Sequence, residues 1–184
     1  MFIKRALIKN SKVFNRHVFE ETLRLTLGVE YEIKYTDKYI YLEIYDFDDS
    51  FSKMNVVSDL LNSDFNTTFT ILLVPKFDAF MLKLLDLANG SGVFNAYQVL
   101  NSSLIKGKIK KEEIPLYLEN IDNELINIFT IYYESGMNIC STARLLYLHR
   151  NTLNYKLTKL SNDLDMDVRD NLIANFIYFL IKNN

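Results

Sequence analysis

A change in hydrophobic periodicity along the chain constrains its fold more than any other feature of the sequence. The segments 29–35 (VEYEIKY) and 39–45 (YIYLEIY) alternate from side to side and are rich in β-branched and aromatic residues, which predicts two strands. The short polar link 36–38 between them predicts a hairpin. From Lys111 onward, apolar residues instead recur three and four positions apart, which is typical of helices. The chain therefore combines a sheet-containing part with a helical part.

The other elements of the first part follow from the same periodicities. Helices are predicted over 15–27, 51–62 and 77–88, and a strand over 67–74. The resulting order is helix, strand, strand, helix, strand, helix. This order predicts a small α/β sandwich in which helices pack against one sheet.

Two segments between the parts favour turns over regular structure. Asn89–Gly92 (NGSG) predicts a turn or hinge, and Lys106–Lys111 (KGKIKK) is the most linker-like stretch of the chain. We place the domain boundary between them, so that residues 1–105 form an α/β module and residues 106–184 a helical domain. The predicted fold class is mixed α+β, with a small amino-terminal α/β sandwich followed by an all-α helix-turn-helix domain.

The helical part contains two short amphipathic helices separated by only three residues, 147–149. Asn138 is a suitable cap for the first of them, and a longer helix over 120–134 precedes both. One face of each helix is apolar: Ile139, Ala143 and Leu146 in the first, and Leu153, Leu157 and Leu160 in the second. The small side chain of Ala143 allows the helices to approach closely. This combination predicts a helix-turn-helix motif.

The opposite face of the second helix is polar. A rotation of about 100° per residue places five side chains away from the leucines; they are Asn151, Asn154, Tyr155, Thr158 and Lys159. Amides pair well with adenine, Arg150 suits guanine or phosphate, and Lys156 suits phosphate. Between Arg144 and Lys159 there are four fixed positive charges and no acid, whereas the whole chain has a net charge of −2. A local DNA-binding patch is one interpretation, and an ordinary solvated helix face is the other.

The segment 138–160 (NICSTARLLYLHRNTLNYKLTKL) resembles the carboxy-terminal helix-turn-helix of the PucR and CdaR family of bacterial transcription regulators. Its specific part is HRNTLNYKL, which is similar to the family consensus of His-Arg-Asn-Thr-Leu, a variable residue, Tyr, a basic residue and Leu. Lys156 stands where the family usually has arginine, and Tyr147 fills a turn position that is glycine in many other helix-turn-helices.

The resemblance extends over about Ile114 to Ile181. Asp167 and Arg169 match the family's Asp-x-Arg before the last helix. Asp165 replaces a glycine of the family, and aspartate tolerates a left-handed backbone better than most residues.

The resemblance implies a sequence-specific transcription regulator whose recognition helix, at about 150–160, enters the major groove of double-stranded DNA. The segment is also similar to the DNA-binding end of the Fis protein, which implies contacts from Asn138, Arg150 and Thr152. For His149, a base contact and a helix cap are both open. The expected DNA-binding residues are Asn138, His149, Arg150, Asn151, Thr152, Asn154, Tyr155, Lys156 and Lys159. A homodimer is expected because one recognition helix covers only a few base pairs.

Full-length members of the family commonly carry a shortened, inactive GGDEF-like domain before the helix-turn-helix. The resemblance therefore implies a regulatory or dimerisation role for residues 1–105, although the sequence Gly-Gly-Asp-Glu-Phe is absent. No effector ligand is identified. The alternative function is a protein–protein interaction module that keeps the helix-turn-helix fold without binding DNA.

Residues that could carry out catalysis or bind metals are scarce. With a single cysteine, Cys140, the chain can form neither an intrachain disulfide nor a cysteine zinc site. Cys140 and the two histidines form no recognisable catalytic pattern. We expect no enzyme activity, no cofactor and no metal. Cys140 is interpreted as a packing thiol. The acidic group Asp46, Asp48 and Asp49 lacks the spacing of a calcium loop and favours a helix cap.

The sequence also bears on location. Charged residues interrupt the apolar amino terminus, so no signal peptide is predicted. The segment 172–181 (LIANFIYFLI) is shorter than the roughly 20 residues that a membrane-spanning helix needs. We expect a cytoplasmic protein with no membrane partner, and we interpret 172–181 as a buried helix that can supply packing for a dimer.

Overall fold

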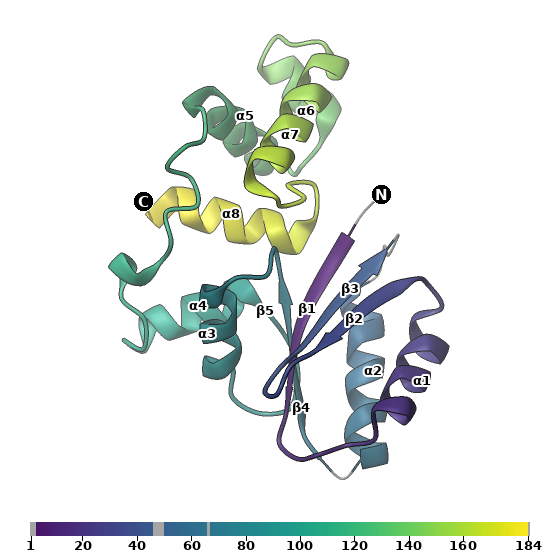
Figure 1. Cartoon of the computed structure of the whole chain (residues 1–184). Helices are drawn as coiled ribbons and strands as arrows, with labels where there is room; N and C mark the ends of the chain where they lie inside the picture. Colours follow the sequence, from purple (N-terminus) through teal and green to yellow (C-terminus); the bar gives the residue numbers. More distant parts are fainter. Residues whose placement is uncertain (1–2, 46–49, 66, 184) are drawn as a thin grey trace. The chain divides into compact units, whose positions relative to one another are not determined.

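The computed structural model describes residues 3–45, 50–65 and 67–183 (Figure 1). Its chain divides into two compact units, Met1–Ile109 and Lys110–Asn184. The first unit contains the sheet and the second is helical, so the predicted mixed α+β class is confirmed. The acidic group Asp46, Asp48 and Asp49 lies outside the described residues.

The first unit is built on a five-stranded sheet with the order β2-β3-β1-β4-β5. Its elements in chain order are β1 (Ile3–Asn10), α1 (Arg16–Leu27), β2 (Tyr31–Tyr35), β3 (Ile40–Tyr45), α2 (Ser50–Phe65), β4 (Phe69–Val74), α3 (Ala79–Leu87), β5 (Gly92–Asn95) and α4 (Ala96–Ile105). Strand β1 pairs antiparallel with both β3 and β4, β2 pairs antiparallel with β3, and β4 and β5 are parallel. The predicted hairpin, the strand before Pro75 and the three predicted helices are all present.

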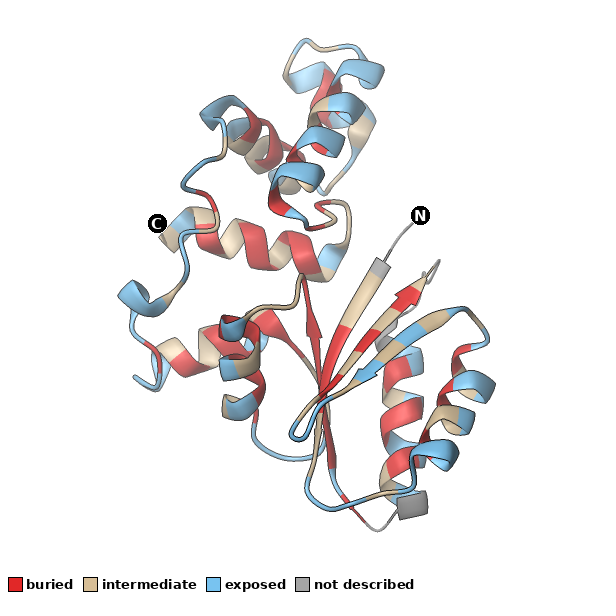
Figure 2. Ribbon diagram, viewed as in Figure 1, coloured by how far each residue is buried: buried red, intermediate tan, exposed pale blue. Residues whose placement is uncertain are grey.

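Helices cover both faces of this sheet. Figure 1 shows α1 and α2 on one face and α3 and α4 on the other. Every residue of β4 is buried, and its sequence FTILLV is apolar except for Thr70, as expected for a strand covered on both faces. Figure 2 shows the same burial along the central strands and on the helix faces that meet them. The core therefore consists of two apolar layers separated by the sheet.

Three elements of this unit were not predicted. The central strand β1 was missed because Lys4, Arg5 and Lys9 interrupt its apolar residues. In the fold, Arg5 Nε lies 2.9 Å from Glu43 Oε1 on β3, and Lys9 Nζ donates to the carbonyl of Leu85 at 2.7 Å. The charges are thus accommodated by partners far along the chain. Strand β5 and helix α4 were also missed, because the turn NGSG leads directly into them.

The second unit contains a single 3-10 turn and four helices within its described residues, 110–183. These are η1 (Lys111–Glu113), α5 (Asn123–Glu134), α6 (Ile139–Leu145), α7 (Arg150–Leu164) and α8 (Asn171–Asn183). The predicted entry helix, the two short helices and the last helix are all found.

Helix α8 packs within this unit. The rings of Tyr133 on α5 and Tyr178 on α8 stack with centroids 4.1 Å apart, and the Tyr133 hydroxyl donates to Asn175 Oδ1 at 2.5 Å. Hydrogen bonds from Tyr178 and Lys182 to the Glu134 carboxylate lower the pKa of that group. The expected burial of the last helix is confirmed. Most of the apolar side chains of α8 are therefore buried within one chain.

Replacing Leu7 with alanine should destabilise the α/β unit by about 2–5 kcal/mol, because this side chain is fully buried in the central strand β1. Hydrogen exchange of the β1 and β4 amides measures the change in the free energy of unfolding. Val13→Ala, at a fully exposed position, is the control. Equal protection of β1 and β4 in both variants would contradict this assignment of the core.

Candidate nucleic-acid interface

The start of α6 is fixed by two hydroxyl groups and an amide. Asn138 Oδ1 accepts a hydrogen bond from the backbone N–H of Ser141 at 3.0 Å, so Asn138 caps α6 as predicted. Thr142 is fully buried, and its hydroxyl donates to the Asn138 carbonyl at 2.7 Å. The Thr142 oxygen also lies 2.7 Å from the hydroxyl of Ser135, at the end of α5. This network ties α6 to α5 through a polar pair that the apolar pattern did not indicate.

The turn between α6 and α7 is tight. Tyr147 adopts a left-handed backbone with φ 54°, and the Leu148 N–H donates to the Ala143 carbonyl at 2.9 Å. Tyr147 therefore occupies the conformation that glycine adopts most easily, at a steric cost. Its side chain is 97% exposed, so packing against the described residues does not compensate for that cost.

His149 caps α7. Its Nδ1 accepts a hydrogen bond from the backbone N–H of Asn151 at 3.3 Å. Of the two roles left open for His149, the structure shows the helix cap. The imidazole remains exposed at the first turn of α7.

Helix α7 has a buried and an exposed face. Leu153, Leu157, Leu160 and Leu164 are all buried. The opposite residues are all exposed: Asn151, Thr152, Asn154, Tyr155, Thr158 and Lys159. Tyr155, at 70% exposure, is the most accessible of the large apolar side chains on this helix. The leucine pattern thus places five of the nine expected DNA-binding side chains, together with Thr158, on one solvent-facing surface, which we call the recognition face.

The positive charges around this face differ in their partners. Lys156 Nζ lies 2.7 Å from Glu124 Oε1 on α5, so this lysine sits on the flank of α7 and is neutralised. Within the described part of the unit, Arg144, Arg150 and Lys159 form no ion pair. The Arg150 guanidinium lies 3.8 Å from the Cys140 sulfur. Cys140 is exposed, so its interpretation as a packing thiol was wrong.

Arg169 connects the loop after α7 back to that helix. Its Nη2 donates to the Asn154 carbonyl at 2.9 Å and to the Thr158 hydroxyl at 3.0 Å. Asp167 Oδ1 accepts from the Arg169 backbone N–H at 3.0 Å, which shapes the loop. The Asp-x-Arg pattern marked both residues, but sequence alone did not reveal their partners.

The loop itself begins with a left-handed residue. Asp165 has φ 52° and ends α7, as expected for an aspartate that replaces glycine. Met166 and Val168, which follow it, are buried. Tyr132 of α5 is also buried, and this burial raises the pKa of its hydroxyl; the opposing effect of the positive charge of Arg169 is smaller. The loop is therefore anchored in the core of the helical unit.

Neither a metal site nor a membrane span is found in the part of the chain that the structure describes. No cluster of three or more His, Cys, Asp or Glu side chains is positioned to hold a metal ion there. Among the described helices, none combines the length and the apolar character needed to cross a membrane.

Arg169→Met should destabilise the helical unit by about 1–3 kcal/mol, because it removes two hydrogen bonds from a charged donor to α7. The effect should be concentrated in faster hydrogen exchange of the α7 amides. Arg144→Met is the control, since Arg144 is an exposed arginine of the same unit with no described partner. If both variants exchange alike, Arg169 does not stabilise α7.

The match to a family model agrees with this geometry. A family model described as the PucR C-terminal helix-turn-helix domain matches residues 125–172. No curated protein matches the chain. Among solved structures, a regulator of polyketide synthase expression from Bifidobacterium adolescentis is similar, with 15% identity and a TM-score of 0.44 over 98% of this chain and 79% of that chain. The stretch from α5 to the start of α8 is therefore a PucR-type helix-turn-helix domain.

Proposed function

We propose that this chain is a transcription regulator that binds double-stranded DNA by inserting α7 into the major groove. The observation that carries the proposal is the recognition face: amide, hydroxyl and cationic side chains lie on one side of a helix whose other side is locked in the core. The domain's match to the PucR type supports the regulatory role. A rigid helix presenting such groups can read base edges because the major groove admits an α-helix.

The chemistry of each side chain suggests its role. Asn151 and Asn154 can pair with adenine, and Arg150 with guanine or phosphate. The remaining expected contacts are to phosphate or to the groove walls, from Asn138, His149, Thr152, Tyr155, Lys156 and Lys159. Of these, Lys156 must exchange its Glu124 partner for a phosphate.

Sequence specificity also requires more than one short helix. We propose that two copies of the chain bind half-sites about 34 Å apart. Because most apolar residues of α8 are buried within one chain, the dimer interface is better sought in the α/β unit. We therefore propose that residues 1–105 have a regulatory or dimerising role.

A second candidate function is a protein-binding module on the same fold. One observation favours it: Leu145, Tyr147 and Tyr155 are 61%, 97% and 70% exposed, and all belong to α6, α7 or the turn between them. Exposed aromatic and aliphatic side chains in one motif are typical of protein contacts. Salt dependence separates the two functions, because phosphate contacts release counterions.

The direct test is fluorescence-polarisation binding to duplex genomic fragments at several salt concentrations. The double variant Arg150→Ala, Lys159→Ala should reduce the slope of log affinity against log salt by about 2, since each phosphate contact contributes roughly 0.9. Lys12→Ala with Lys34→Ala, two exposed lysines of the α/β unit, is the matched control and should leave the slope unchanged. Equal slopes in the two double variants would reject the DNA-binding role of α7.

Glu124→Gln tests the part played by Lys156. Removing the carboxylate frees the ammonium for phosphate, so DNA affinity should rise by up to about fivefold, the upper range for a surface ion pair. The salt slope should also become steeper by about 1. Glu119→Gln removes an exposed carboxylate that has no described partner on α7, and it should change neither quantity. A fall in affinity for Glu124→Gln would show that the ion pair positions Lys156 productively.

A further inference from the structure

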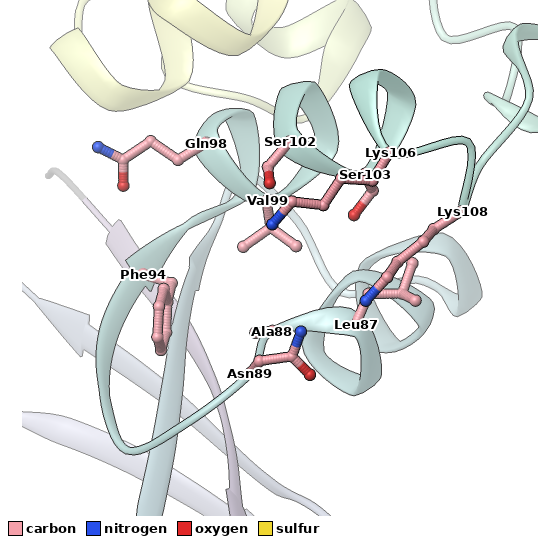
Figure 3. A pocket seen from close by; sticks show the side chains of 10 residues that line it. All are labelled: Leu87, Ala88, Asn89, Phe94, Gln98, Val99, Ser102, Ser103, Lys106 and Lys108. Atoms are coloured by element: carbon pink, nitrogen blue, oxygen red, sulfur yellow. The ribbon is translucent and has the colours of Figure 1, made fainter.

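We propose that a cleft in the α/β unit binds a small carboxylate that carries an apolar, ring-sized body. The cleft lies between the end of α3, strand β5 and helix α4, and its volume is about 180 Å³ (Figure 3). It is separate from the recognition face, and the inference does not rest on DNA binding.

The floor of the cleft is apolar. Leu87 and Ala88 contribute from the end of α3, Phe94 from β5 and Val99 from α4. Ala88 and Val99 are only 5% and 7% exposed, so the floor is continuous with the core. An apolar cavity of about 150 Å³ holds benzene in a well-studied protein, so a single ring fits a space of this size. The floor therefore selects for an apolar body.

The rim of the cleft is positively charged. Lys106 and Lys108 line it, and Figure 3 shows both side chains extending back over the space between α3 and α4. No aspartate or glutamate is among the residues that line the cleft. Neither lysine forms an ion pair within the described parts of the chain. Two ammonium groups without a carboxylate partner create a local potential that favours an anion.

The two lysines are held by an ordered turn. The Ser103 carbonyl accepts the backbone N–H groups of Lys108 and Ile109 at 2.8 and 3.3 Å. Gly107, with φ 64°, makes the reversal without a steric cost. Ile109 is buried beneath the turn. The lysine backbones are thus fixed at the cleft mouth, which reduces the ordering cost of binding.

Neutral hydrogen-bonding groups complete the rim. Asn89, Gln98, Ser102 and Ser103 are the uncharged polar residues among those that line the cleft. A carboxylate accepts several hydrogen bonds, and bonds from charged donors are the strongest of these. An apolar floor with a few convergent polar groups is the usual composition of a small-molecule site.

The lysines have a competing explanation that needs no ligand. They follow the carboxyl end of α4, where positive charge stabilises the helix dipole. That effect depends on charge alone and predicts no preference for a ligand with an apolar body. The two explanations therefore differ in the ligand selectivity of the cleft.

The test is a titration of the ¹⁵N-labelled full chain with benzoate, followed by amide chemical shifts. Benzamide, which has the shape without the charge, and acetate, which has the charge without the ring, are the comparison probes. We expect saturable shifts at 87–89, 94 and 98–108 with benzoate, and affinities at least about tenfold weaker for the other two, the loss expected for a missing charged hydrogen bond or buried ring.

Variants locate the site. Lys106→Gln with Lys108→Gln should weaken benzoate binding about tenfold, whereas Lys12→Gln with Lys34→Gln should leave it unchanged. Unaltered spectra elsewhere in the chain confirm that each variant is folded. Equal affinities for acetate and benzoate, shifts outside the cleft, no saturable shifts at all, or full binding by the Lys106 and Lys108 variant would each overturn the proposal.

Discussion

The burial of four leucines along one face of α7 is the constraint on which the functional surface depends. Because Leu153, Leu157, Leu160 and Leu164 are fixed in the core of the helical unit, rotation about the helix axis is determined. The side chains between them must then face solvent. The Arg169 hydrogen bonds to the Asn154 carbonyl and the Thr158 hydroxyl hold the same helix from its outer edge, so the recognition face is a rigid surface.

The four helices of the helical unit could be predicted from its sequence, because the signals that define each helix are local. Caps such as Asn138 and the leucine spacing lie within the segments that they organise. The α/β unit was harder to predict, since β1 carries charges whose partner, Glu43, is distant in sequence. Strand β5 is short and follows a turn signal. The exposure of Cys140 was also missed, because a seven-residue helix gives a weak indication of which face is buried.

Side-chain pairing was the other feature that periodicity did not reveal. Of the four cations in the predicted patch, Lys156 is neutralised by Glu124 from the preceding helix, and the other three form no ion pair with the residues that the structure describes. The same reasoning applies to the cleft of the α/β unit, where charge and shape come from three elements, α3, β5 and α4, and from the turn after α4. Each unit thus has its own core and its own candidate binding surface.

The most direct test of the central claim is a map of the amide shifts that duplex DNA causes in the ¹⁵N-labelled chain. Our account predicts that the largest changes fall on 138–141 and 149–159, with little change at the buried end of α7. Amide shifts confined to other elements would contradict it. The same shifts with a neutral crowding polymer in place of DNA would also contradict it, because they would not depend on DNA.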